Sequence, residues 1–180
     1  MLASHPLVLA KLRDKILQTV GSNAYSTIGN IRDMRYLRAV IDEVLRLFQP
    51  VPLNSCESTR STVLESEGKK YFPDSEEFDP ERWLDERYEK YVGPNPFVFL
   101  LLNVGPRICL SQRFVYNETS FFVVRLLQLV NSIKFALDVQ TPPPASWVGR
   151  QGRKGIEKIW PRAHLTMYAE GGLWLRMKMD

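Results

Sequence analysis

Cys109 is the residue of this sequence whose type and position best suit it to chemistry. It follows the turn-forming residues Gly105, Pro106 and Arg107 and precedes a long stretch with helical periodicity. A helix start and a nearby guanidinium are both positive, so they favour the thiolate form of a cysteine at this place. A thiolate can act as a nucleophile or bind a metal ion. Cys109 is therefore the first candidate for a functional residue.

Three interpretations of Cys109 follow from the residues alone. A nucleophile needs a histidine base, and both His5 and His164 are distant from it in sequence. A metal ligand is the second, and a lone protein thiolate suits haem iron, whereas no CxxC or HxxxH spacing favours structural zinc. The third is a buried structural cysteine, the common fate of a free thiol. Cys56 is too far away in sequence to indicate a disulfide framework.

Glu43, Arg46 and Arg82 form a second set of charged candidates. Glu43 and Arg46 are three residues apart on the polar side of an expected helix, where such a pair usually contributes only about 0.2–1 kcal/mol at the surface. Arg82 stands next to Trp83 and alone indicates a solvated or stacked arginine. None of these three residues indicates a function by itself.

Hydrophobic spacing predicts two helices in the first 50 residues. The first opens at Ser4, a suitable N-cap, continues through Leu9, Leu12 and Ile16, and ends at residues 21–23. A polar loop should extend to Asn30. The second begins at Asp33 and runs until the prolines at 50 and 52 stop it. Residues 51–87 lack a regular pattern and predict turns, a short strand at 62–64, and Phe78 and Trp83 packed against the core.

The rest of the chain predicts one long helix and a hairpin. An apolar run covers residues 97–102, the turn of residues 105–109 follows, and a helix spans about 110–131. Alternating residues at 164–168 and 173–177 flank Gly171-Gly172, which predicts a β-hairpin. The expected fold class is therefore mostly α with a minor β part.

Composition limits the classes of function. Of the 180 residues, 44% are hydrophobic and 24% charged, which is typical of a globular protein. The net charge of +4 comes from scattered Lys and Arg, so no nucleic-acid partner is expected. A plain solvated surface and a basic face for an acidic redox partner or an anionic membrane both stay open. The absence of a run of about 20 apolar residues predicts no membrane anchor in this chain, and its cysteine usage favours a reducing compartment.

Three motifs occur in an informative order. Glu43-Val-Leu-Arg46 has the form ExxR, Phe78-x-Pro-Glu-Arg82-Trp follows it, and Gly105-Pro-Arg-Ile-Cys109 precedes the long helix. In this order they resemble the cytochrome P450 superfamily. The resemblance covers most of the chain, from Ser4 to the last strands, and the sequence is similar to fungal members that hydroxylate alkanes and fatty acids.

The resemblance implies an incomplete cytochrome P450 fold. Residues 1–180 would be the C-terminal, haem-binding portion of a single domain, with half of that domain or more lying upstream. The implied activity is that of a haem-thiolate monooxygenase. Such an enzyme takes electrons from a flavin-containing reductase and inserts oxygen into an apolar small molecule, here an alkane or fatty acid. Full-length members lie in the endoplasmic reticulum membrane; without an anchor, a cytoplasmic location is the alternative for this chain.

The resemblance also assigns roles to residues. Cys109 would be the thiolate ligand of the iron of haem b, Gly105 would allow the tight turn before it, and Arg107 would approach a haem propionate. Glu43, Arg46 and Arg82 would form a buried network that locks the region behind the haem. No residue of this chain is assigned as catalytic.

Several positions depart from the family pattern. Leu102 replaces an aromatic residue, Ser111 replaces a glycine, and Cys56 stands where relatives carry an arginine. The chain is also shorter between Leu64 and Tyr71, and it has no match to the family's oxygen-activating helix. The expectation is a chain that is inactive or impaired as it stands. The alternatives are a non-catalytic remnant and a haem-free interaction protein.

Overall fold

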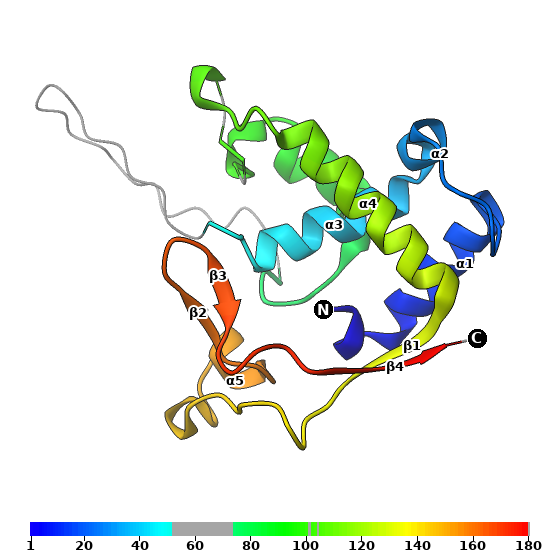
Figure 1. The fold of residues 1–180 in the computed structure, drawn as a ribbon. Helices are drawn as coiled ribbons and strands as arrows, with labels where there is room; N and C mark the ends of the chain where they lie inside the picture. The colour runs from blue at the N-terminus through cyan, green and yellow to red at the C-terminus, as the bar shows by residue number, and fades with distance from the viewer. Residues whose placement is uncertain (52–73, 101, 104, 180) are drawn as a thin grey trace, which may run out of the picture.

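The computed structural model describes residues 1–51, 74–100, 102–103 and 105–179. Within these residues there are five α-helices and four short strands, together with short 3-10 turns and one π-helical turn (Tyr88–Val92). The helices are α1 (Pro6–Thr19), α2 (Ile28–Asp33), α3 (Arg35–Leu47), α4 (Gln112–Leu129) and α5 (Arg153–Ile156); the strands are β1 (Val130–Phe135), β2 (Pro161–Ala163), β3 (Met167–Ala169) and β4 (Leu175–Met179). The prediction of a mostly α fold with a minor β part is confirmed (Figure 1).

Helix α1 forms much as its sequence predicts. Pro6 occupies the first helical position, where its missing N–H costs nothing. The apolar positions Leu9, Leu12 and Ile16 are all buried. The predicted N-cap is wrong by one residue, because Ser4 closes a 3-10 turn over Leu2–Ser4 and His5 takes the cap position.

The polar loop predicted up to Asn30 contains a helix instead. Thr27 caps α2: its hydroxyl accepts a hydrogen bond from the Asn30 amide, and the Asn30 side chain accepts one from the Thr27 amide. This reciprocal pair satisfies amides that a helix start leaves without a partner, so six residues suffice for a helical turn and a half. Asp33 consequently ends α2, and α3 begins two residues later than predicted.

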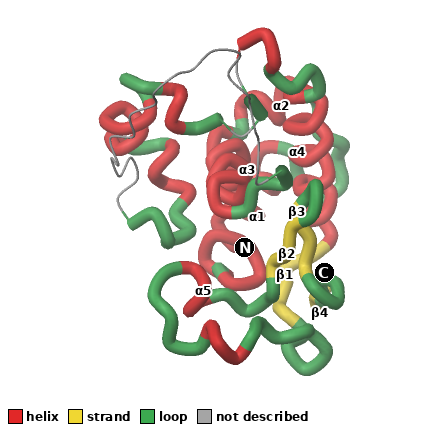
Figure 2. The backbone as a smooth tube through the Cα atoms, turned by 90° about the vertical axis from the view of Figure 1, so that its left-hand side faces the viewer, coloured by secondary structure: helices red, strands yellow, loops and turns green. Residues whose placement is uncertain are grey.

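The core lies where α1, α3 and α4 meet. Leu12 and Ile16 of α1, Leu37 of α3, and Val124 and Leu127 of α4 are almost completely inaccessible to solvent. Both views show α3 and α4 close together, with the strands toward one end of the molecule (Figures 1 and 2). Phe78, which the sequence places against the core, is buried in this cluster, as predicted. The core therefore fixes α3, which carries Glu43 and Arg46, and α4, which follows Cys109.

The strands form two separate antiparallel pairs, and the predicted hairpin is wrong. β1 pairs with β4, opposing Ile133 to Met177, while β2 pairs with β3. The segments on either side of Gly171-Gly172 thus belong to different pairs. Buried Gln140 explains this: its side chain donates to the Gly172 carbonyl and accepts from the Trp174 amide, which draws the chain after the glycines toward the end of β1. The long helix also ends at Leu129, because β1 begins at the next residue.

Several predictions lie outside the described residues. These are the strand at 62–64, the position of Cys56 and the shortened stretch between Leu64 and Tyr71. Among the helices that are described, none is both long and apolar enough to cross a membrane.

Candidate functional site

Glu43 is the centre of a buried charged network. Its Oε1 accepts hydrogen bonds from Arg46 Nη2 (2.9 Å) and Arg82 Nε (3.0 Å), and its Oε2 accepts one from Arg46 Nε (2.8 Å). The exposed fraction of the side chain is 0% for Glu43, 9% for Arg46 and 2% for Arg82. The structure therefore joins the three residues, and the interpretation of Glu43 and Arg46 as a surface pair is wrong.

Two further donors complete the coordination of the Glu43 carboxylate. The Asp79 amide donates to Oε1 at 2.9 Å, and the Trp83 indole donates to Oε2 at 3.0 Å. Sequence reasoning placed Trp83 in the core but did not identify it as a donor to Glu43. A signal existed, because a buried indole N–H needs an acceptor. No pattern could have identified the Asp79 amide, which is a main-chain group.

The arginines also hold the segment that carries them. Arg46 donates to the carbonyls of Ser75 (2.7 Å) and Glu77 (3.0 Å). Arg82 donates to the carbonyl of Asp74 at 3.3 Å. An irregular segment has few partners for its own carbonyls, so these bonds supply what a helix or sheet would otherwise provide. The network thereby fixes residues 74–83 against α3.

The charge of Glu43 is stabilised in spite of its burial. Burial by itself raises the pKa of a carboxyl group. The hydrogen bonds from Arg46, from the Asp79 amide and from Trp83 outweigh this effect, and the pKa of Glu43 lies below its ordinary value of 4.5. The carboxylate is thus ionised in the folded chain at neutral pH, as an ion pair with two buried arginines requires.

Cys109 and Gly105 lie in a second, separate loop. The Cys109 amide donates to the Leu102 carbonyl at 2.9 Å, and the Ile108 amide donates to the Gly105 carbonyl at 3.0 Å. Gly105 has a φ of +69°, a conformation that glycine adopts without strain, and no atom lies within 4 Å of a Cβ built on it. The backbone of Arg107 belongs to the 3-10 turn Gly105–Arg107; its side chain is not among the described parts of the chain.

The Cys109 loop has an apolar and accessible surface. Leu110 is 99% exposed and Phe114, one helical turn later, is 65% exposed. Ile108 is also exposed, whereas Cys109 itself is half-buried and its thiol is free. The carbonyl of Cys109 accepts a hydrogen bond from the Gln112 amide, the first residue of α4. A half-buried thiol is thus presented at the start of a helix among exposed apolar side chains.

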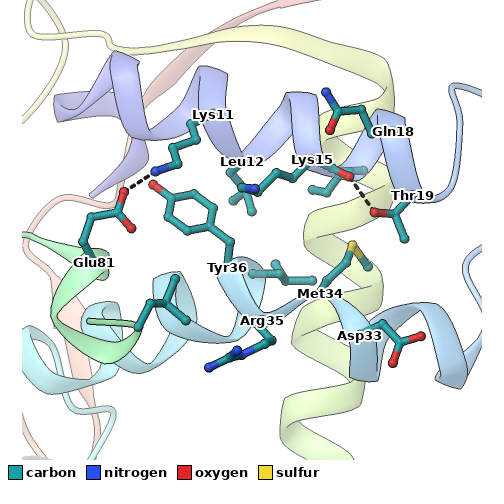
Figure 3. Close-up of a pocket in the computed structure, with 13 residues that line it drawn as sticks. Lys11, Leu12, Lys15, Gln18, Thr19, Asp33, Met34, Arg35, Tyr36 and Glu81 are labelled. Atoms are coloured by element: carbon teal, nitrogen blue, oxygen red, sulfur yellow. Dashed lines mark hydrogen bonds and ion pairs between the residues drawn. The ribbon is translucent and has the colours of Figure 1, made fainter. Parts of the chain in front are cut away.

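A shallow, half-open pocket of about 410 Å³ lies apart from these residues (Figure 3). α1, α3 and Glu81 border it, and Lys11 forms an ion pair with Glu81 across its edge (Figure 3). Its lining includes Asp33 and Arg35 but none of Gly105, Arg107 and Cys109. Across the described ranges, no group of three or more His, Cys, Asp or Glu side chains could together hold a metal ion.

Comparison with known proteins identifies the family. The cytochrome P450 family model matches residues 1–67 and, in a second overlapping part, residues 61–146. The chain belongs to the cytochrome P450 family. The resemblance to this family that the sequence indicated is confirmed. The two parts of the match overlap at residues 61–67, which include the beginning of the stretch that the sequence predicts to be shortened.

Fungal cytochromes P450 match almost the whole chain. Cytochrome P450 52A6 of Candida tropicalis is 29% identical over 208 residues, covering 98% of this chain and 36% of the relative. A cytochrome P450 of Arthroderma benhamiae is 32% identical, covering 99% and 39%. Cytochrome P450 monooxygenase himC of Aspergillus japonicus is 28% identical, covering 99% and 32%. The chain thus spans between 32% and 39% of the length of these relatives.

The family implies a haem whose iron is held by a cysteine thiolate, and the residues present fit that group. Cys109 is a free, half-buried thiol within residues 61–146, the second part of the chain that the family model matches. Leu110 and Phe114 expose apolar surface beside it, which a flat apolar macrocycle could cover. Gly105 leaves open space where any other residue would place a side chain.

Proposed function

We propose that this chain is the haem-binding region of a cytochrome P450 monooxygenase, with Cys109 as the thiolate ligand. The observation that carries the proposal is the free, half-buried thiol of Cys109, three residues before α4, in a family member. The reaction class is oxygen insertion into an apolar small molecule. An alkane or fatty-acid chain is the proposed substrate, on the resemblance of the sequence to fungal members that hydroxylate such molecules; relatives that match the chain are fungal cytochromes P450.

The loop residues would bind and orient the prosthetic group. Cys109 is held by its amide, which donates to Leu102, and by its carbonyl, which accepts from the first residue of α4. These bonds fix the backbone that carries the thiol before any ligand arrives, which lowers the ordering cost of binding. Arg107 would offer its guanidinium to a haem propionate, where a charge-assisted hydrogen bond is strong. Bound haem b supplies the activation of dioxygen, which electron donation from a thiolate ligand favours.

The Glu43 network would serve as the rigid support behind this loop. Its side chains are buried and hydrogen-bonded to one another and to the carbonyls of residues 74–77. A fully paired buried network of this kind rigidifies its surroundings. It does not touch a substrate and is not proposed to be catalytic.

Turnover would need more than these 180 residues. The sequence has no match to the family's oxygen-activating helix, and a closed pocket that excludes water is part of such chemistry. The chain alone is therefore proposed to bind haem and to be inactive or impaired as an oxygenase. In the full-length context, a flavin-containing reductase would supply electrons and the endoplasmic reticulum membrane would be the location.

A haem titration of the purified chain tests the proposal. We expect saturation at one haem per chain, followed by the Soret band, and clearly weaker binding by Cys109→Ser. Cys56→Ser is the matched control and should bind as the wild type does. A soluble, helical wild-type chain that takes up no haem would overturn the proposal and favour the alternatives, a non-catalytic remnant or a haem-free interaction protein.

A further inference from the structure

A buried pair of residues, Asp42 and Tyr116, links the Glu43 network to the helix that follows the Cys109 loop. The Tyr116 hydroxyl of α4 donates to Asp42 Oδ1 of α3 at 2.7 Å. Tyr116 is 8% exposed and Asp42 is 9% exposed. The two residues are 74 positions apart in the sequence, so the bond joins helices that local structure does not hold together.

Arg38 completes this contact. Its Nε donates to Asp42 Oδ2 at 2.9 Å, and its guanidinium carbon lies 3.3 Å from the centroid of the Tyr116 ring. Both oxygens of the Asp42 carboxylate are thereby paired. Burial and the adjacent Asp42 charge raise the pKa of Tyr116, so its hydroxyl stays protonated and remains a donor.

Asp42 and Tyr116 connect the turn of α3 that carries Glu43 with the helix that follows Cys109. Asp42 immediately precedes Glu43, and the two carboxylates face different partners: Glu43 binds the segment of residues 74–83, whereas Asp42 binds α4. Tyr116 lies seven residues after Cys109, on the helix whose first amide is bonded to the Cys109 carbonyl. One turn of α3 therefore contacts both the buried network and the helix that follows the thiol.

We propose that Asp42 and Tyr116 are positioning residues for Cys109. Their hydrogen bond fixes the rotation of α4 about its axis and its position along that axis relative to α3. It thereby holds the Cys109 loop at a fixed position relative to the Glu43 network. Apolar packing between two helices tolerates small rotations and sliding, whereas a buried hydrogen bond has one geometry. The inference rests on the proposed role of Cys109 as the haem ligand.

Tyr116→Phe removes the hydroxyl and keeps the ring under Arg38. In the haem-free chain, hydrogen exchange of the amides at 105–116 should become about five- to tenfold faster, the ratio expected for one lost hydrogen bond. Amides of α1 should keep their wild-type rates. Tyr168→Phe is the control, since Tyr168 lies on β3 and its exposed hydroxyl is hydrogen-bonded to the nearby His164. Asp42→Asn should have a smaller effect than Tyr116→Phe, because its amide oxygen can still accept from Tyr116. Its amide nitrogen cannot accept from Arg38, but that side chain is half-exposed and can turn to solvent.

Haem binding supplies the second measurement. Tyr116→Phe should raise the dissociation constant for haem about fivefold or more above that of the wild type, because the Cys109 loop is less ordered before haem binds. It should also increase the share of the reduced carbon-monoxide complex that lacks the thiolate-type Soret band.

The outcomes separate this inference from the proposed function. Wild-type chain that binds haem, together with Tyr116→Phe that exchanges and binds haem just as the wild type does, overturns the positioning role alone. Faster exchange spread evenly over the whole chain also overturns it, because that is the result of lower global stability. Wild-type chain that binds no haem overturns the proposed function itself, and with it any role of the pair toward a haem ligand.

Discussion

The Glu43 network and the Cys109 loop are organised in opposite ways. Glu43, Arg46 and Arg82 are buried, and in the described part of the chain both carboxylate oxygens accept hydrogen bonds from side chains or a main-chain amide. The Cys109 loop is held by main-chain bonds, with Leu110 and Phe114 exposed beside a free thiol. The difference indicates that the network needs no further group to satisfy its charges, whereas the Cys109 loop presents an apolar surface that a further group can cover.

Removing the Glu43 carboxylate should destabilise the buried Glu43 network. Glu43→Ala leaves two buried arginines without their counter-charge, so the free energy of unfolding should fall by about 3–5 kcal/mol. Urea unfolding followed by circular dichroism measures this change. Glu81→Ala is the matched control, because Glu81 is an exposed acid paired with Lys11 and should cost less than about 1 kcal/mol. Equal costs for the two variants would contradict the buried network.

Trp83→Phe should have a smaller effect on the same region. It keeps an aromatic ring but removes the indole N–H that donates to Glu43 Oε2. A buried acceptor that loses one partner costs about 1–3 kcal/mol. Trp174→Phe, in which an exposed indole loses its bond to the Gly171 carbonyl, should cost clearly less in the same urea experiment. If the two tryptophan variants unfold alike, the bond to Glu43 contributes nothing.

Gly105→Ala should affect the loop through its backbone alone. The residue has a φ of +69° and a Cβ added there would meet open space, so the cost is that of a left-handed alanine, about 1 kcal/mol. Gly29→Ala is the control within a helix, where alanine is favoured and stability should rise slightly. A thermal melt of both variants checks the opposite signs. Stabilisation by Gly105→Ala would show that the loop does not adopt this conformation.

The adjacent carboxylates Asp42 and Glu43 should respond to pH in opposite directions. The pKa of Glu43 is lowered in the folded chain, so its contribution is present above its ordinary value and lost as the pH falls. Burial outweighs the hydrogen bonds from Tyr116 and Arg38 and raises the pKa of Asp42, so its contribution is present at low pH and lost as the pH rises through that raised value. These are the smallest effects expected, because each concerns a single proton.

Unfolding by urea from about pH 3 to pH 6, across the ordinary carboxyl range, measures these slopes. Glu43→Gln should remove part of the loss of stability on the acid side. Asp42→Asn should instead remove part of the loss of stability that occurs as the pH rises toward 6. Parallel profiles for the wild type and both variants would mean that neither carboxyl group has a shifted pKa.

The sequence predicted the members of each region better than their surroundings. The order of the motifs identified Glu43, Arg46, Arg82 and Cys109, although the spacing of Glu43 and Arg46 alone indicated only a surface pair. Burial of that pair depends on residues 74–83 lying over α3, a long-range contact that no local pattern encodes. The assignment of Cys109 and Arg107 to a haem stays a prediction.

Strand pairing and cross-helix contacts were the least predictable features. Alternation around Gly171-Gly172 indicated two strands but not their partners, which the bonds of Gln140 to residues 172 and 174 decide. Asp42 and Tyr116 carried no signal at all, because each is an ordinary residue on its own helix. Such contacts follow from packing of the core, so they can be found only once α3 and α4 are placed.

The most direct test of the central claim is the absorption spectrum of the reduced, carbon-monoxide-bound chain after reconstitution with haem. The wild type should show the red-shifted Soret band of thiolate ligation, and Cys56→Ser should keep it. Cys109→Ala should lose the band while retaining its helical circular dichroism, because the thiol supports no part of the core. A soluble wild-type chain without the band, or a Cys109→Ala variant that keeps it, would contradict the assignment of Cys109 as the haem ligand.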